Sequence, residues 1–228
     1  MLELVLDGLR LRYPDLAEPA LDLPRLRVAA GSSLAVTGPS GAGKSTFINA
    51  ITGLERPTEG CVLWQGQDIA RLSESGRDRW RARHVGLVMQ DFHLFPGLSA
   101  VENVLLPARF RHLRLPSQLR ERAVALLERV GLTPGARGIE TFSRGEMQRV
   151  AIARALLSGP GVIVADEPTA SLDPGSGAAV CALLVALAQE HRATLIVVTH
   201  DQALSGRLQR RITLGGGRLV ADTQGESA

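Results

Sequence analysis

A single lysine occurs in this sequence, and its surroundings restrict the possible folds. Of the 26 lysine and arginine side chains, 25 are arginine and one is Lys44. The lysine lies in a run that fits the pattern G-x-x-x-x-G-K-[ST], made of Gly38, Pro39, Ser40, Gly41, Ala42, Gly43, Lys44, Ser45 and Thr46. A compact ammonium fits among backbone amides that surround a phosphate, whereas a planar guanidinium is wider. The run therefore predicts a phosphate-binding loop.

The composition is that of an ordinary globular protein. The 228 residues suffice for one large domain or two small lobes, and 45% are hydrophobic and 21% charged. A net charge of +3 gives no indication of nucleic-acid binding, and we expect no such partner. Cys61 and Cys181 lack the spacing of metal ligands, which fits a reducing compartment.

Two observations bear on the compartment. No apolar run reaches about 18 residues, so no segment is expected to span a membrane. Glu3 and Asp7 interrupt the leucines near the first residue, so we expect no signal peptide. The sequence thus favours a protein kept in the cytoplasm.

Short apolar segments and helical patterns predict an α/β fold. We expect helices at residues 44–53 and 173–189, and a solvated surface segment at 77–83. The continuous apolar character of 161–165 and 194–199 is typical of parallel strands that are buried on both faces. Further strands are expected at 2–6, 25–29, 33–37, 61–65 and 85–89, and a closing hairpin at 211–214 and 218–220.

Residues 91–160 have a different, mainly helical character. Helices are expected at 117–130 and 143–157, the second opened by a capping box of Ser143 and Glu146. We therefore predict a mainly parallel sheet core with a small antiparallel β subdomain near the N-terminus and an inserted α-helical subdomain. The core would comprise 1–90 and 161–222, the insert 91–160, and a disordered tail 223–228.

Two carboxylates follow the buried strand at 161–165. Adjacent side chains at a strand end point in different directions, so Asp166 would hold Mg²⁺ and Glu167 would lie nearer the terminal phosphate as a base. The alternative is a helix start, because Pro168 follows and acidic residues favour helix N-termini. The phosphate-binding loop favours the first interpretation.

Other polar residues are expected at the same edge of the sheet. Lys44 would reach the β- and γ-phosphates and the Ser45 hydroxyl would ligate Mg²⁺. Gln90 follows a predicted strand, and its amide could bind Mg²⁺ or a water and release it; a surface glutamine is the alternative. His200 follows the strand at 194–199 and could donate to the γ-phosphate.

The segment from Phe142 to Arg149 reads Phe-Ser-Arg-Gly-Glu-Met-Gln-Arg and resembles the LSGGQ signature of ATP-binding cassette (ABC) proteins. The phosphate-binding loop, Gln90, the strand before Asp166 and His200 follow the order found in that family. The resemblance covers nearly the whole chain. It implies a P-loop NTPase (RecA-like) core, binding of ATP and Mg²⁺, and ATPase activity.

The resemblance also implies a head-to-tail dimer of two copies with two ATP molecules between them. Ser143, Gly145 and Glu146 would address the ATP held by the second copy, and Asp173 would cross the interface. Tyr13 precedes Gly38 by 25 residues, where the family has an aromatic residue that stacks on adenine. Ordinary packing of a lone tyrosine is the alternative.

The signature departs from the family pattern at two positions. Phe142 replaces a leucine, which is a tolerable apolar exchange, and Arg144 replaces a glycine. If the backbone at Arg144 needed a positive φ, a side chain would cost about 1 kcal/mol or more. Otherwise Arg144 would face solvent or add positive charge near the partner's phosphate.

Members of this family without membrane spans usually serve a separate permease. Phe92, Leu94 and Phe95 would contact it, or would pack inside the helical lobe. Further segments resemble the bacterial branch that contains lipoprotein-releasing, macrolide-exporting and cell-division ATPases. The branch implies an export or extraction subunit at the cytoplasmic face of the inner membrane. The alternative is an ATP-switched regulator that signals through a membrane partner; DNA-repair and translation relatives fit less well.

Overall fold

The chain folds into two β-sheets and a group of helices. A computed structural model describes residues 1–110, 114–135 and 137–223. The strands are β1 (Leu4–Leu11), β2 (Leu21–Val28), β3 (Ser33–Thr37), β4 (Glu59–Trp64), β5 (Gln67–Asp68), β6 (Val85–Val88), β7 (Val162–Asp166), β8 (Thr194–Val198), β9 (Arg210–Gly215) and β10 (Arg218–Asp222). The helices are α1 (Lys44–Thr52), α2 (Glu74–His84), α3 (Ala100–Arg109), α4 (Ser117–Arg129), α5 (Arg144–Leu156), α6 (Pro174–Glu190) and α7 (Gln202–Ser205), with 3-10 turns at Ile69–Arg71 and Ile139–Thr141.

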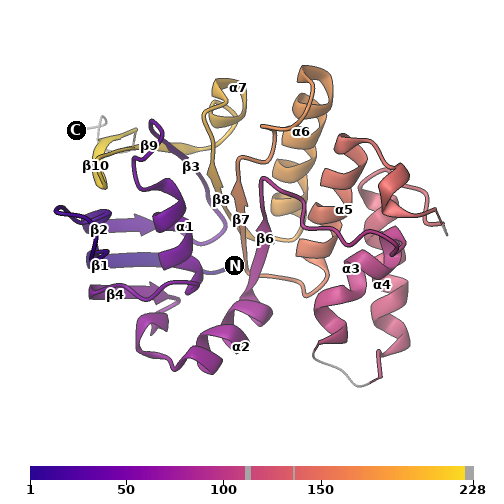
Figure 1. Ribbon diagram of the computed structural model, residues 1–228, viewed down its shortest axis with the longest axis horizontal. Coiled ribbons are helices and arrows are strands. Elements are labelled where there is room, and N and C mark those ends of the chain that lie inside the picture. Colours follow the sequence, from indigo (N-terminus) through magenta and orange to yellow (C-terminus); the bar gives the residue numbers. More distant parts are fainter. Residues whose placement is uncertain (111–113, 136, 224–228) are drawn as a thin grey trace.

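The smaller sheet is antiparallel and has the strand order β2-β1-β4-β5. Leu6 of β1 is paired with Leu26 of β2 and with Val62 of β4, and all three side chains are buried. Pro24 lies in β2, an edge strand, where the missing N–H leaves no ladder bond unmade. The sheet forms the left side of the molecule in Figure 1.

The larger sheet has the order β10-β9-β3-β8-β7-β6 and is parallel except for β10. Its central strands are buried on both faces. Val162 and Val164 pack with the antiparallel sheet and α1, whereas Ile163 and Ala165 pack with α3, α5 and α6. This alternation follows from the two-residue period of a strand, and it explains why the sequence there is continuously apolar.

The helices α3, α4 and α5 stand together at the other end of the molecule, on the right of Figure 1. Leu105 of α3, Leu127 of α4 and Val150 of α5 belong to one hydrophobic cluster with the larger sheet. The described residues contain no helix that is both long and apolar enough to cross a bilayer.

Several expectations about local structure need correction. The segment 77–83 is the greater part of helix α2, which begins after the N-cap Ser73 and buries Trp80. Helix α3 was not expected, although Ser99 and Glu102 form a capping box at its start. The first two strands are longer than predicted, because β1 continues to Leu11 and β2 begins at Leu21. The tail expected at 223–228 lies outside the described residues, apart from Thr223.

Candidate functional site

The phosphate-binding loop connects β3 to α1, and its glycines are required by the backbone. Gly38, Gly41 and Gly43 have φ values of 146°, 75° and 95°. A Cβ on Gly38 would lie 2.3 Å from the Leu214 carbonyl oxygen. The N-cap Gly43 makes no side-chain cap to α1, so the first-turn amides of this helix can bind an anion.

Lys44 lies on the first turn of α1 and reaches back over the loop. Its Nζ donates to the carbonyl oxygens of Gly38 at 2.8 Å and Pro39 at 2.9 Å. An ammonium has three donors, so one remains for an anion while the other two hold the loop.

A cavity of about 420 Å³ gathers most of the predicted site residues. The phosphate-binding loop forms its floor, and side chains from three other elements approach it. Its lining consists of Tyr13, Leu16, Ala20, Ser40, Gly41, Ala42, Gly43, Lys44, Ser45, Thr46, Gln90, Asp166 and Glu167. Three of the lining segments follow the carboxyl ends of β3, β6 and β7 of the parallel sheet, as expected, and the connection from β1 to β2 joins them at the cavity.

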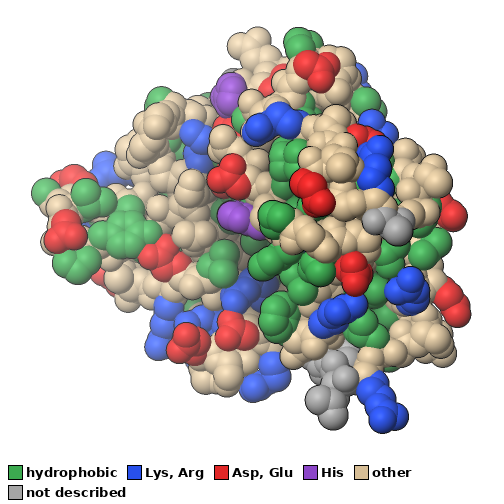
Figure 2. Space-filling model, turned by 45° about the vertical axis from the view of Figure 1, so that its right-hand side comes forward, with side chains coloured by type: hydrophobic (Ala, Val, Ile, Leu, Met, Phe, Trp, Pro, Cys, Tyr) green, Lys and Arg blue, Asp and Glu red, His purple; other side chains and the backbone are tan. Residues whose placement is uncertain are grey.

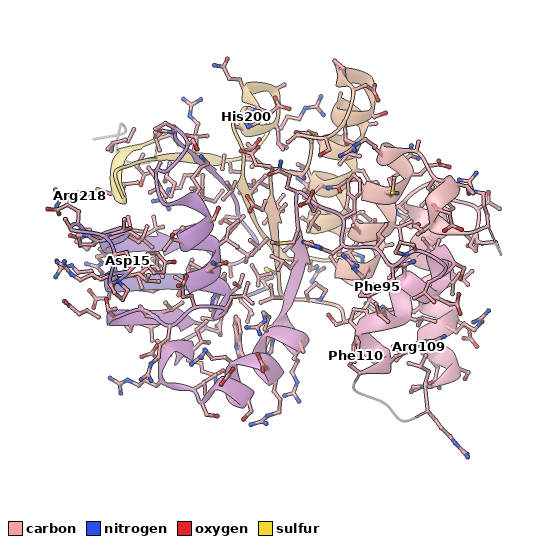
Figure 3. All side chains as sticks on the ribbon, in the orientation of Figure 1. Asp15, Phe95, Arg109, Phe110, His200 and Arg218 are labelled. Atoms are coloured by element: carbon pink, nitrogen blue, oxygen red, sulfur yellow. The ribbon has the colours of Figure 1, made fainter. Side chains whose placement is uncertain are left out.

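Glu167 and His200 form a pair beside this cavity. His200 Nδ1 lies 2.9 Å from Glu167 Oε2, and the His200 backbone N–H donates to the same oxygen at 3.3 Å. Glu167 has a φ of 45°, which is rare for a residue with a side chain and often marks a functional position. Its side chain is 14% exposed and that of His200 is 71% exposed. Figure 3 shows His200 at the upper edge of the molecule, beyond the end of β8.

Asp166 ends strand β7 and lies among charged groups. Burial raises the pKa of its carboxyl and the neighbouring Glu167 charge raises it further, whereas Lys44 lowers it. The lysine thus offsets part of the cost of an ionised carboxylate at this position. A divalent cation would favour the ionised form in the same way.

Tyr13 lines the cavity and is fixed by its hydroxyl group. Its OH donates to Glu55 Oε2 at 2.7 Å, and Asn49 Nδ2 donates to the same oxygen at 3.5 Å. Burial raises the pKa of the Tyr13 phenol, and the bond to Glu55 raises it further. The ring is thereby held at the cavity, and Glu55 is a residue that the sequence gave no reason to choose.

The signature residues Ser143, Gly145 and Glu146 do not line this cavity. Ser143 Oγ accepts from the Glu146 N–H at 3.2 Å, and Glu146 Oε2 accepts from the Ser143 N–H at 2.7 Å. This confirms the predicted capping box. Arg137 pairs with the other Glu146 oxygen at 2.6 Å, and the Ser143 amide and Arg137 together lower the pKa of this carboxyl. The Glu146 carboxylate is thus engaged by the N-cap of its own helix and by Arg137.

Asp173 is the N-cap of α6, and α6 packs against the start of α5. Its carboxylate accepts from the Ser176 N–H at 3.0 Å, and bonds from the Ser176 hydroxyl and amide lower its pKa. A Cβ on Gly145 would approach Ser176 Oγ at 3.3 Å, so a side chain there would crowd α6. A larger residue at Gly145 would therefore require Ser176 to shift slightly.

Arg144 is the first residue of α5 and does not have a positive φ. The backbone strain considered from the sequence is therefore absent. Its Nε donates to the Ser171 carbonyl oxygen at 2.8 Å, and its guanidinium carbon lies 5.5 Å from the centre of the Phe92 ring. Neither contact could be anticipated from the sequence.

The three residues expected to meet a permease lie in different environments. Phe92 is half-buried beneath Arg144, and Leu94 packs against the helical cluster. Phe95 is 54% exposed, and Figure 3 shows it on the helical side of the molecule. Arg154 holds this segment, because its guanidinium donates to the carbonyl oxygens of Phe92 at 2.7 Å and His93 at 2.6 Å. Burial lowers the pKa of Arg154.

A second cavity of about 420 Å³ lies where α2 and β6 meet α3, α4 and α5. It is mainly apolar and has arginines among its lining residues, which are Ala82, Arg83, Val85, Leu87, Pro107, Ala108, Leu119, Arg122, Arg154, Ala155, Leu157 and Ser158. We call it the interlobe groove. The sequence did not reveal it, because its walls come from five elements.

Comparison with known proteins agrees with this geometry. The family described as ABC transporter matches residues 21–170. The lipoprotein-releasing system ATP-binding protein LolD of Pseudomonas syringae pv. tomato is 42% identical over 197 residues, which cover 86% of each chain. The macrolide export ATP-binding/permease protein MacB of Sodalis glossinidius is 43% identical over 200 residues; the match spans 87% of this chain but only 30% of that protein.

Among solved structures, the ATP-binding cassette MJ0796 is similar over almost the whole chain. Its dimeric post-hydrolysis structure with ADP and Pi has a TM-score of 0.86 and 35% identity, covering 96% of this chain and 97% of that one. The fold is therefore that of a P-loop NTPase, as predicted. With the family match over more than half of its length, the chain belongs to the ABC transporter family.

Proposed function

We propose that this chain is the ATP-hydrolysing subunit of a bacterial transporter, with its nucleotide site in the cavity that Lys44 and Glu167 line. The observation that carries this proposal is the convergence of the phosphate-binding loop, Gln90 and two carboxylates on that cavity. The loop fits a polyphosphate, since the Gly38 backbone leaves no room for a side chain and the first amides of α1 are uncapped.

The donor set also fits Mg²⁺. A hydroxyl, an amide oxygen and a carboxylate are hard oxygen ligands, and Ser45, Gln90 and Asp166 supply them around one cavity. When bound, the ion would neutralise charge on the phosphate oxygens. The raised pKa of Asp166 fits this assignment, because a buried carboxylate that lacks full compensation is a natural cation ligand.

Glu167 acts as the general base or orients the attacking water. Its carboxylate is aimed by a left-handed backbone and held by the His200 ring and N–H. His200 therefore positions Glu167 and, being largely exposed, can also turn toward a phosphate. Tyr13, held by Glu55, provides the face on which adenine stacks.

Two copies of the chain would close head to tail over two ATP molecules. The N-terminus of α5 lies outside that cavity, and the positive end of its helix dipole favours an anion, which supports a role toward the ATP of a second copy. Ser143 and Gly145 would contact that ATP, Glu146 would shape the turn, and Asp173 would lie at the interface. In this arrangement residues 1–90 and 161–222 form the ATP-binding core, and 91–160 the helical subdomain.

A separate permease would dock on the helical side, in the interlobe groove and near Phe95. Hydrophobic side chains gather on the face that comes forward in Figure 2, with basic side chains among and below them. By analogy with LolD and MacB, the work would be extraction or export, performed at the cytoplasmic face of the inner membrane. Arg154 lines the groove and holds the Phe92 carbonyl, which offers a route from the permease to the Gln90 segment.

The proposal is tested by expressing tagged Glu167→Gln protein in its own host and solubilising membranes with ATP or with ADP. A stoichiometric membrane partner with a periplasmic domain, recovered with ATP, supports the transporter subunit. A soluble dimer without a membrane partner would overturn it. Reconstitution of the wild-type chain with the identified partner then separates export from signalling, because a signalling pair hydrolyses ATP but moves no cargo.

The docking site has its own test. Ala82 is exposed and lines the groove, so Ala82→Asp should abolish capture of the partner while ATP binding is kept. Ala186→Asp, at an exposed position of α6, is the matched control and should capture the partner normally. Equal capture by both variants would exclude the groove as the docking site.

A further inference from the structure

Helix α5 holds the segment between Glu167 and Asp173 at two points. Gln148 Nε2 donates to the Pro168 carbonyl oxygen at 2.9 Å in a buried position, and Arg144 Nε donates to the Ser171 carbonyl oxygen at 2.8 Å. Arg144 and Gln148 are four residues apart on α5 and therefore share a face of the helix. The segment is thus attached to α5 at two residues, Pro168 and Ser171.

The same helix holds the segment that follows Gln90, also at two points. Arg154, in the last turn of α5, binds the Phe92 and His93 carbonyl oxygens. Arg144, at the first turn, covers the Phe92 ring at 5.5 Å, within the range of a cation–π contact. Arg144 contacts both segments at once, through the Ser171 carbonyl oxygen and the Phe92 ring.

We propose that Arg144 is a positioning residue that links the Gln90 segment to the Asp173 segment through the start of α5. This inference rests on the proposed ATPase function. A displacement of Phe92 would move the guanidinium, and the bond to Ser171 would pass that displacement to the chain between Glu167 and Asp173. A planar guanidinium suits this task, because it can donate in its plane and present its face to a ring.

Arg144 does not act, on this proposal, as a charge that binds the partner's phosphate. The geometry favours the link, because Nε is already engaged by Ser171 and the guanidinium carbon lies over the Phe92 ring. The two roles differ in what they predict for kinetics. A misplaced segment slows turnover, whereas a lost phosphate contact weakens ATP binding and ATP-dependent dimerisation.

The test measures kcat and KM for Mg-ATP on the full chain, alone and with any permease that co-purifies. Arg144→Ala should lower kcat about three- to tenfold while KM changes less than about twofold, because misplacement of reacting groups costs rate rather than binding. Arg144→Lys should recover only part of the loss. Arg129→Ala is the matched control, since Arg129 forms an exposed pair with Glu190 on the far ends of α4 and α6.

A double-mutant cycle with Phe92→Leu identifies the link itself. If Arg144 acts through Phe92, the combined variant should lose no more rate than the greater of the two single changes. Additive losses, an unchanged kcat in Arg144→Ala, or a loss confined to KM would each overturn the inference. Wild-type protein that does not hydrolyse ATP would instead contradict the proposed function, so the two failures are distinguishable.

Discussion

Glu167 Oε2 lies 2.9 Å from His200 Nδ1 and accepts from the His200 backbone N–H at 3.3 Å. One oxygen of the carboxylate is therefore held by a single residue from the end of the neighbouring strand. Glu167 also has a positive φ of 45°, a backbone conformation that residues with a side chain rarely adopt. The contact with His200 thus restrains the Glu167 carboxylate at the cavity.

Replacement of Glu167 by glutamine should abolish the base and keep the shape of the side chain. We expect ATP binding to persist and hydrolysis to fall about 10²- to 10⁴-fold, the usual contribution of a general base. Phosphate release and ATP-dependent dimerisation, followed by light scattering, check both parts. Normal turnover of this variant would remove Glu167 from the mechanism.

Replacement of Lys44 should weaken nucleotide binding. Lys44→Ala removes a charged donor and leaves the Gly38 and Pro39 carbonyls without it, so we expect a loss of about 10- to 100-fold in ATP affinity. Lys44→Arg keeps the charge and should also bind poorly, because the guanidinium is too wide for the loop. Calorimetry with ATP separates the two effects, and wild-type affinity in Lys44→Arg would contradict the steric argument.

Asp166 should make the nucleotide-free protein less stable at neutral pH. Because burial and Glu167 raise its pKa in the folded state, folding favours the protonated form, and this contribution is lost as pH rises through the folded-state pKa. Asp166→Asn should therefore melt at a higher temperature than wild type at pH 7. The difference in melting temperature should shrink as the pH falls toward and below 3.8, the ordinary pKa of an aspartate side chain. Equal melting temperatures at pH 7 would contradict the raised pKa of Asp166. Asp166→Asn should also lose Mg-dependent hydrolysis.

Two capping boxes allow the structural and functional roles of the signature serine to be separated. Ser143 caps α5 and Ser99 caps α3 with the same pattern of bonds. Each serine-to-alanine change should lower the free energy of unfolding by about 1 kcal/mol, measured in urea. We expect only Ser143→Ala to reduce ATPase activity beyond its effect on stability. Equal activity losses would indicate that Ser143 is no more than a cap.

Much of the site could be predicted because it follows strands and turns of strong local character. The glycines around Lys44 predict a turn, and the apolar run before Asp166 predicts a buried strand. Helix α2 was missed because it is rich in arginine and buries essentially one apolar side chain, Trp80. Helix α3 carries a readable signal in the sequence, which is the capping-box spacing of Ser99 and Glu102.

The remaining features depend on contacts between segments that are distant in sequence. Arg144 contacts Ser171, which lies 27 residues later in the sequence, and Phe92, which lies 52 residues earlier. No local sequence pattern predicts these contacts. The same holds for Tyr13 and Glu55, which are 42 residues apart. An arginine that is buried and one that is solvated look alike in a sequence, so Arg154 could not be singled out.

The lysine held over the phosphate-binding loop has a practical consequence for chemical probing. Apart from the α-amino group, Lys44 Nζ is the only primary amine in the chain, and two carbonyl oxygens hold it at the nucleotide cavity. An acylating reagent that consumes amines will therefore report on a single side-chain atom. Its rate of reaction becomes a direct gauge of site occupancy, slow when ATP shields the amine and fast when the cavity is free.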